Sequence, residues 1–172
     1  MFLKIFKNFS AKRIIKKKLV NSYSDVSDCK IKTVGILIDE TDFNEKENLV
    51  KALLKSGFQS ENITLLAYKN KYKKKEELDY LHFSKKDVSW IGTIDKKEVR
   101  EFKAKEFDLL IGYFQEKKAP LLLVTHNSKA KFKAGFSNID KRLFHLMIDT
   151  PQEDYAVFVD ELVKYLRILN KL

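Results

Sequence analysis

After residue 30 the chain alternates short apolar runs with longer segments whose apolar residues recur at helical spacing. Continuous apolar runs are typical of buried strands. They predict strands at Thr33–Ile38, Ile63–Tyr68, Phe107–Ile111, Ala119–Thr125 and Leu143–Ile148, with shorter candidates at Tyr80–Phe83 and Val88–Ile91. Helical spacing predicts helices at Asn44–Ser56, Lys96–Phe102 and Gln152–Leu169. This alternation predicts an α/β fold with three layers, a mostly parallel sheet of five to six strands with helices on both faces.

A basic segment precedes this pattern and carries no acid before Asp25. Its large apolar side chains recur at i, i+3, i+4 and i+7 on one helical face, in Phe2, Ile5, Phe6 and Phe9. We therefore expect a basic helical arm over residues 1–22. The polar, Ser-rich residues 23–30 read as a linker, and residues 31–172 as one domain.

Basic residues outnumber acidic ones by 34 to 24, which gives a net charge of +10. A charge of this size attracts phosphate-rich partners. The basic residues also cluster, in the arm, in the stretch Lys69–Lys75 and between Lys129 and Arg142. The predicted nucleic-acid contacts are Lys4, Lys7, Lys12, Arg13, Lys16, Lys17, Lys18, Lys71, Lys73, Lys74, Lys75, Lys129, Lys131 and Lys133.

Cysteine content and hydropathy indicate a compartment. Cys29 is the single cysteine, so an internal disulfide is impossible and a reducing cytosol is expected. The sequence contains no apolar run of the roughly 18 residues that a membrane-spanning helix needs. We expect a cytoplasmic protein.

The turn Asp39–Asp42 follows the first predicted strand, where ligands bind in open α/β sheets. It has no glycine, and the chain contains neither G-x-G-x-x-G nor a Walker-type loop. These absences argue against a dinucleotide enzyme and a P-loop NTPase. Its three acids could hold Mg²⁺. The plainer interpretation is a solvated turn, with Asp42 or Asn44 capping the next helix.

A second candidate turn, His126–Ser128, follows the apolar run Pro120–Val124. His126 could act as an acid or base and Ser128 as a nucleophile, with Asp149 as the one acid placed to converge on them. The three histidines show no metal-ligand spacing. We therefore expect neither a metal nor a cofactor.

The segment Ser128–Phe136 alternates basic and apolar residues. A strand here would place Lys129, Lys131 and Lys133 on one side and apolar side chains on the core side. Such a row of ammonium groups suits a phosphate backbone. Lysines also protect an edge strand from aggregation, and both interpretations stay open.

Three interpretations of the arm compete. It could bind rRNA or another nucleic acid through its lysines, with its phenylalanines stacking or wedging. It could lie on an anionic membrane surface with its apolar face inserted. It could instead pack that face on the domain. The dense run KRIIKKK favours a polyanion.

The segments FDLLIGYF, which begins at Phe107, and APLLLVTHNSKAKFKAGF, together with FSKKDVSWIG at Phe83–Gly92, carry a resemblance. They resemble an uncharacterised Bacteroidetes family of small basic α/β proteins, which implies no activity. The same stretch is faintly similar to the acceptor-side domain of heptosyltransferase-like glycosyltransferases. That similarity implies a fold kept without the nucleotide-sugar-binding half.

The sequence thus predicts a non-enzymatic RNA-binding protein, associated with the ribosome and anchored by the arm and the surface lysine clusters. Its expected partners are rRNA and ribosomal proteins, without a small-molecule cofactor. The alternatives are a small enzyme or ligand-binding domain that uses the Asp39–Asp42 and His126–Ser128 turns, and a peripheral membrane protein.

Overall fold

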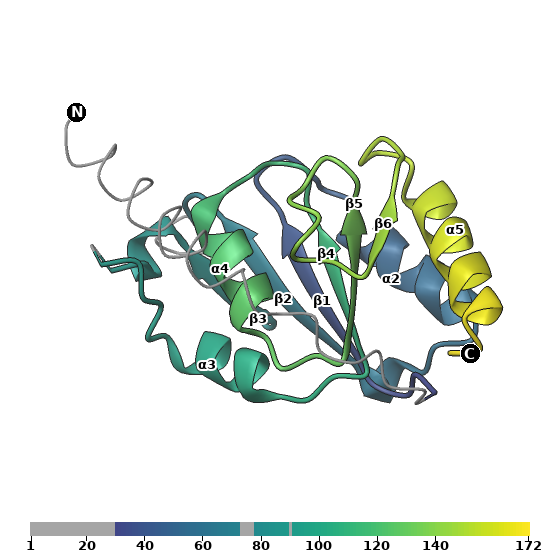
Figure 1. Cartoon of the computed structure of the whole chain (residues 1–172). Coiled ribbons are helices and arrows are strands. Elements are labelled where there is room, and N and C mark those ends of the chain that lie inside the picture. The colour runs from purple at the N-terminus through teal and green to yellow at the C-terminus, as the bar shows by residue number, and fades with distance from the viewer. Residues whose placement is uncertain (1–29, 73–77, 90) are drawn as a thin grey trace.

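The computed structural model of this chain describes residues 30–72, 78–89 and 91–172. A six-stranded sheet in the order β3-β2-β1-β4-β5-β6 forms its centre (Figure 1). All neighbouring strands are parallel. The strands are β1 (Val34–Asp39), β2 (Ile63–Lys69), β3 (Leu81–Ser84), β4 (Leu109–Tyr113), β5 (Phe132–Phe136) and β6 (Leu146–Ile148).

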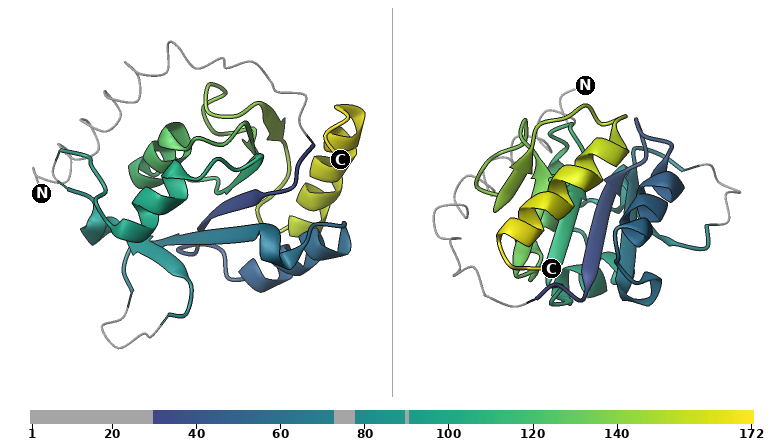
Figure 2. Two further views of the ribbon diagram at one scale, coloured as in Figure 1. Left: turned by 90° about the horizontal axis from the view of Figure 1, so that it is seen from below. Right: turned by 90° about the vertical axis from the view of Figure 1, so that its right-hand side faces the viewer.

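Helices cover both faces of this sheet (Figure 2). On one face α2 (Lys46–Lys55) packs beside α5 (Tyr155–Ile168), and on the other α3 (Lys97–Ala104) packs beside α4 (Ala119–Asn127). Short 3-10 turns are η2 (Ser60–Asn62) and η3 (Lys85–Asp87). The predicted three-layer α/β fold is therefore confirmed. The arm expected at residues 1–22 lies outside the described residues.

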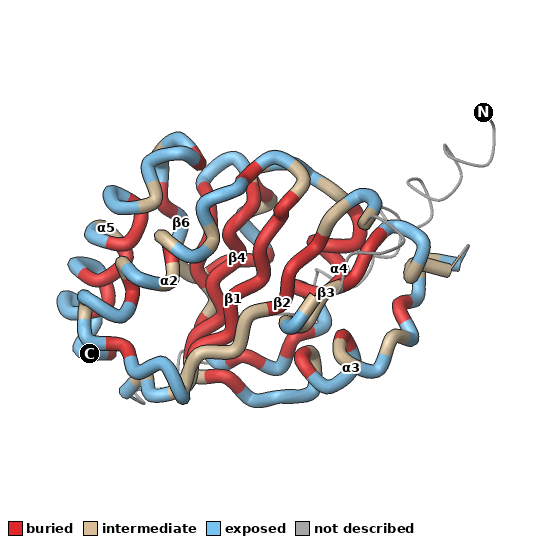
Figure 3. The backbone as a smooth tube through the Cα atoms, turned by 180° about the vertical axis from the view of Figure 1, so that it is seen from behind, coloured by how far each residue is buried: buried red, intermediate tan, exposed pale blue. Residues whose placement is uncertain are grey.

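An aromatic cluster joins the sheet to α5. Tyr113 of β4 lies 5.0 Å from Phe136 of β5 and 5.1 Å from Phe158 of α5, measured between ring centroids. The Tyr113 hydroxyl donates to the carbonyl of Gln152, so this buried phenol has a hydrogen-bond partner. Burial, reinforced by nearby acids, raises the Tyr113 pKa above its ordinary value. Buried residues follow the strands and the inner helix faces, as the apolar pattern predicts (Figure 3).

Three of the predicted strands need correction. Residues 119–125 form most of the helix α4, not a strand. Leu121–Val124 are buried all round that helix, so the run carries no helical period for sequence analysis to detect. The expected strand Leu143–Ile148 begins only at Leu146. Of the described residues in Val88–Ile91, only Val88 forms a bridge, an antiparallel one to Ile94.

Two glycines leave room for a phenylalanine on the face that α4 covers. Gly112 of β4 and Gly135 of β5 are paired in register, so their missing side chains would point to the same face. Phe144, from the connection between β5 and β6, fills this space. A Cβ on Gly112 would lie 2.5 Å, and one on Gly135 2.4 Å, from the Phe144 ring. The Phe144 ring therefore covers the part of this sheet face that α4 leaves open.

The start of the described domain is tied to its C-terminus. The Ile31 N–H donates to the Lys171 carbonyl at 2.8 Å, and the Lys30 ammonium donates to the Leu172 carbonyl at 2.6 Å. Because β1 begins three residues later, the chain enters the sheet at its amino edge. By amino edge we mean the side of the sheet where the N-terminal ends of the parallel strands lie, and by carboxyl edge the side where their C-terminal ends lie. Within the described ranges, no helix combines the length and apolar character needed to cross a membrane.

The glycine pair gives a test of this packing. Gly135→Ala should lower the free energy of unfolding by about 1–3 kcal/mol, because the new methyl overlaps the Phe144 ring. The midpoint of urea unfolding measures the effect. In a Phe144→Leu background the same substitution should cost clearly less, since the ring is gone. An equal cost in both backgrounds would show that Phe144 does not fill this space.

Candidate functional site

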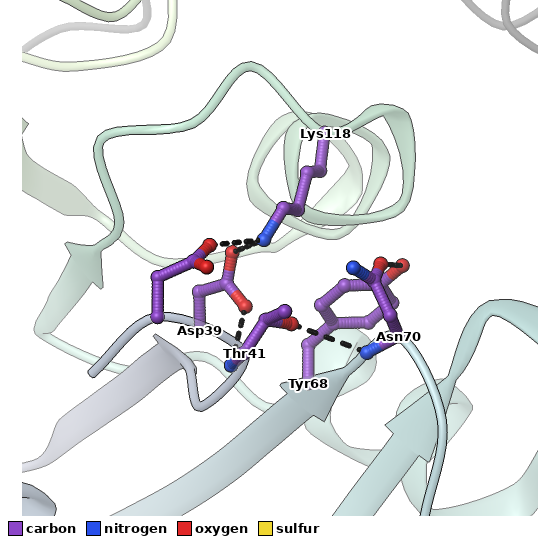
Figure 4. Close-up of polar contacts among 6 residues, drawn as sticks. Asp39, Thr41, Tyr68, Asn70 and Lys118 are labelled. Carbon is purple, nitrogen blue, oxygen red and sulfur yellow. Dashed lines mark hydrogen bonds and ion pairs between the residues drawn. The ribbon is translucent and has the colours of Figure 1, made fainter. Parts of the chain in front are cut away.

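The turn Asp39–Asp42 lies at the carboxyl end of β1 and holds a lysine. The Lys118 ammonium, at the N-terminal end of α4, donates to Asp39 at 2.5 Å and to Asp42 at 2.7 Å (Figure 4). Asp39 is almost fully buried, with 2% of its surface exposed. Burial opposes the charge on Lys118, but the hydrogen bonds and charges of both aspartates outweigh it and raise its pKa.

Hydrogen bonds connect this turn to the end of β2. The Thr41 N–H donates to Asp39 at 3.0 Å, and the Thr41 hydroxyl accepts from the Asn70 N–H at 3.2 Å. Asn70 in turn accepts from the Tyr68 hydroxyl at 3.1 Å (Figure 4). Burial, together with the charge of Asp39, raises the Tyr68 pKa to about 12. The turn is thus a closed polar network and not the solvated turn that the sequence predicts.

Glu40 organises a second group at the same edge. Its carboxylate accepts from the Lys46 ammonium at 2.5 Å, from the Tyr80 hydroxyl at 3.0 Å and from the Tyr72 hydroxyl at 3.3 Å. The Lys46 nitrogen also lies 3.3 Å from the centroid of the Tyr80 ring, a cation–π contact. Only a small hollow of about 140 Å³ lies beside this group.

The strand order makes the carboxyl edge the place where a ligand is expected. The order reverses between β1 and β4, and open α/β sheets of this order bind nucleotides in the crevice at that point. Here Asp39 and Lys118 occupy the crevice. The turn also presents carboxylates where phosphate-binding folds present glycine N–H groups. This geometry disfavours a nucleotide phosphate at the switch point.

The turn His126–Ser128 is not a turn after a strand, because these residues lie at the C-terminal end of α4. Lys118 begins the same helix, so His126 lies about 12 Å further along its axis. The Ser128 hydroxyl accepts from the Ala130 N–H at 3.2 Å. His126 and the Asp39–Asp42 turn therefore lie at opposite edges of the sheet and do not form one site.

Asp149, the acid expected to converge on His126, also lies apart from it. It follows β6 at the carboxyl edge, where it accepts from the Ser137 hydroxyl at 2.8 Å. Among the described residues, no group of three or more His, Cys, Asp or Glu side chains is placed to hold a metal ion. The catalytic arrangement that the sequence offered as an alternative is not assembled by this fold.

The lysines of residues 129–133 separate into two environments. Lys129 and Lys131 are exposed at the amino edge, just before β5, whereas Ala130, Phe132 and Ala134 are buried as the alternation predicts. Lys133 instead turns inward, and its ammonium donates to the Thr125 carbonyl at 2.7 Å.

This inward lysine caps a helix. The Lys133 charge lies at the C-terminal end of α4, where the helix dipole favours a cation. Burial lowers its pKa to about 8. Of the expected row of three outward lysines, Lys129 and Lys131 are exposed, and the Lys131 ammonium is ion-paired with Asp108. The edge-strand interpretation is also wrong, since β5 lies between β4 and β6.

Asp108, which the sequence analysis does not single out, organises the amino edge. Its carboxylate accepts from the N–H groups of Lys32 and Thr33 at 3.1 and 2.9 Å and from the Thr33 hydroxyl at 3.0 Å. The Lys131 ammonium donates to its other oxygen at 2.8 Å. No local motif marks this residue, because its partners lie 23 to 76 positions away.

The remaining predicted contacts lie elsewhere. Lys71 is exposed just after β2, at the carboxyl edge. A strand of five to seven residues, about 17–23 Å long, separates it from Lys129 and Lys131. The arm residues, Cys29 and the lysines at 73, 74 and 75 lie outside the described residues.

Asp108 predicts a pH dependence. Burial works to raise its pKa, but the hydrogen bonds from Lys131, Thr33 and Lys32 outweigh burial and lower the pKa from 3.8 to about 2. A carboxyl with a depressed pKa stabilises the fold above its unfolded pKa and loses that contribution as the pH falls through the folded value. Asp108→Asn should therefore unfold at lower urea than the unmodified protein at pH 6.

The same comparison at acid pH completes this test. The stability difference between the two proteins should shrink as the pH falls from about 4 towards the folded pKa of about 2, because Asp108 itself then becomes neutral. A difference that stayed constant over this range would contradict the assigned role of the carboxylate charge.

The buried ion pair makes a further prediction. Lys118→Met should cost about 3–5 kcal/mol of unfolding free energy, because it leaves the Asp39 carboxylate buried and unpaired. Adding Asp39→Asn should recover much of that loss. Lys117→Met, at the neighbouring exposed lysine, is the matched control and should change little. Equal effects of the two lysine substitutions in urea unfolding would contradict the importance of the pair.

Comparison with known proteins places the chain in a family. Residues 7–169 match the family of unknown function DUF6913. No curated protein and no solved structure matches the chain. These comparisons therefore add no support for the similarity to heptosyltransferase-like glycosyltransferases. Since the match spans nearly the whole sequence, the protein belongs to the DUF6913 family, an uncharacterised family of the kind that its sequence resembles.

Proposed function

We propose that this protein binds RNA without catalysing a reaction, and that it is a cytoplasmic protein associated with the ribosome. The basic arm and the amino edge of the sheet would together form the RNA-binding surface. The observation that carries this proposal is the place where the arm joins the domain. The described residues begin, at Lys30, at the edge that presents Lys129 and Lys131.

Asp108 supports this juxtaposition. One carboxylate accepts both the Lys32 N–H, two residues after the start of the described domain, and the Lys131 ammonium. The described domain therefore begins beside Lys131. In the proposal, the seven basic residues of the arm and the exposed lysines of this edge contact one stretch of phosphates.

The end of α3 extends the basic edge. The Lys129 N–H donates to the Lys103 carbonyl at 3.1 Å, so the segment before β5 lies against the C-terminal end of α3. Lys105, exposed just after that helix, lies at the same edge, where its ammonium donates to the Thr64 hydroxyl at 3.0 Å. Sequence clustering alone does not join these lysines, because about 25 residues separate them along the chain.

The exposed lysines at the two edges of the sheet therefore have different roles in the proposed RNA binding. Lys129 and Lys131 belong to the surface that continues into the arm. Lys71 lies at the far edge and would meet only an RNA that spans the sheet. Lys133, which caps α4, is withdrawn from the proposed contact surface.

Charge neutralisation tests the proposal in the full-length chain. Changing the seven basic residues of the arm to glutamine should lower the slope of log Kobs against log [salt] by up to about 5 for single-stranded RNA. Lys105→Gln with Lys129→Gln should lower it by about 1.5. Lys51→Gln with Lys85→Gln, two exposed lysines away from the edge, is the matched control. Filter binding to an rRNA fragment at several salt concentrations gives all the slopes.

Sedimentation tests the ribosomal part. The full-length protein should move with a ribosomal subunit in a sucrose gradient at low salt and leave it at high salt, whereas the arm-neutralised protein should stay at the top. An unchanged affinity and salt slope after neutralisation would overturn the RNA proposal. Flotation with anionic vesicles, without retention by RNA, would replace it with the membrane alternative.

A further inference from the structure

A groove between α3 and α4 lies next to the basic edge. It has a volume of about 320 Å³, at the lower end of the range for small-molecule sites. The loop of residues 91–95 forms one wall, and the two helices form the others. We call this the α3–α4 groove.

Two cations face this groove from α3. Arg100 and Lys103 are three positions apart, so they lie on the same side of the helix. Among the described residues, no ion pair within 4.0 Å involves either of them. Burial lowers the pKa of Lys103, Arg100 lowers it further, and Asp95 opposes both effects. A bound anion would offset this repulsion and replace the lost hydration.

One wall of the groove is apolar. Ile94 and Leu123 are buried beneath it, each with 5% of its surface exposed, and Val124 is fully buried. Ile91 at the rim is half exposed. Asn127 at the end of α4 adds an amide with both donors and an acceptor. The lining thus combines two cations and the Asp95 carboxylate with an apolar wall and one amide.

This combination identifies a class of ligand. Two adjacent cations match a terminal phosphate, which carries close to two negative charges at neutral pH. An apolar wall with one amide suits a flat, partly polar ring such as a nucleobase. The contact between the Lys129 N–H and the Lys103 carbonyl places the groove beside the proposed RNA surface.

We infer that the α3–α4 groove binds a single nucleotide that carries a terminal phosphate. The phosphate lies between Arg100 and Lys103, and the base lies against Ile91 and Leu123. The nucleotide is either free or the 5′-phosphorylated end of an RNA. The second source rests on the proposed function, whereas the first does not. The site is separate from the strand-order switch point, which Asp39 and Lys118 occupy.

Methyl NMR of the full-length protein tests this inference. Titration with AMP should shift the methyl signals of Ile94 and Leu123, and titration with adenosine should leave them unchanged at the same concentrations. The methyls of Leu49, buried in α2 on the other face, are the internal control. An absence of AMP-dependent shifts at Ile94 and Leu123 would overturn the inference.

Variants connect the shifts to the two cations. Arg100→Gln with Lys103→Gln should weaken AMP binding at least tenfold, and Arg100→Gln alone provides the same readout if the double variant folds poorly. Lys51→Gln with Lys85→Gln should bind AMP normally. Equal AMP affinity in the cation variants and the unmodified protein would exclude this site.

A pair of RNA oligonucleotides distinguishes the two sources. An oligonucleotide with a 5′-phosphate should bind more tightly than the same sequence with a 5′-hydroxyl, and Arg100→Gln should remove the difference. If AMP binds but the two oligonucleotides bind equally, the RNA end is excluded and the free nucleotide is supported. The salt slope of the arm-neutralised protein tests RNA binding separately. Failure of the nucleotide site would therefore not imply failure of the proposed RNA-binding function.

Discussion

The Asp108 carboxylate is the interaction on which the arrangement of the amino edge depends. A carboxylate with little exposed surface is costly unless its oxygens accept hydrogen bonds, and here four donors supply them. Those donors come from the start of β1 and from the segment before β5, while Asp108 itself precedes β4. One partly buried charge therefore fixes the relative positions of three adjacent strands. It also holds Lys32, close to the start of the described domain, next to Lys131.

At the carboxyl edge of the sheet, buried carboxylates are likewise stabilised by polar partners. Asp39 and Glu40 are carboxylates at the end of a buried strand, and each is neutralised by a lysine from a neighbouring helix, Lys118 or Lys46. The strand order is one that leaves a crevice for a nucleotide at this point. Ion pairs fill it, and a bound phosphate would have to displace them against the charge of Asp39. The fold thus provides the position at which such sheets usually bind a nucleotide, but the side chains at that position disfavour its phosphate.

Sequence analysis succeeds where the pattern is local and fails where packing decides. The run at β1 is apolar without period because a parallel strand is covered on both faces, and it is correctly predicted as a strand. The run at α4 looks the same because this helix is also buried nearly all round. Pro120, in the first helical turn, is the signal that distinguishes the two. Without that signal His126 is expected at a strand end beside Asp39–Asp42, whereas it lies at the end of a helix and at the other edge of the sheet. The partners of Asp108 and Lys118 lie too far along the chain for any local pattern to reveal.

The attachment of the arm explains how individually weak contacts could act as one surface. A single lysine–phosphate contact contributes little at physiological salt, because the phosphate was already partly neutralised by counterions that the lysine replaces. Two basic surfaces joined by a short segment behave differently, since binding by the first holds the second at a high effective concentration near the same RNA. Ile31 and Lys30 are hydrogen-bonded to Lys171 and Leu172, so the first described residues of the domain are held at a fixed point. A fixed point beside Lys131 makes the edge and the arm successive parts of one proposed contact. The same point on the carboxyl edge would have set the arm beside Asp39, Glu40 and Asp42, where acidic side chains repel phosphate.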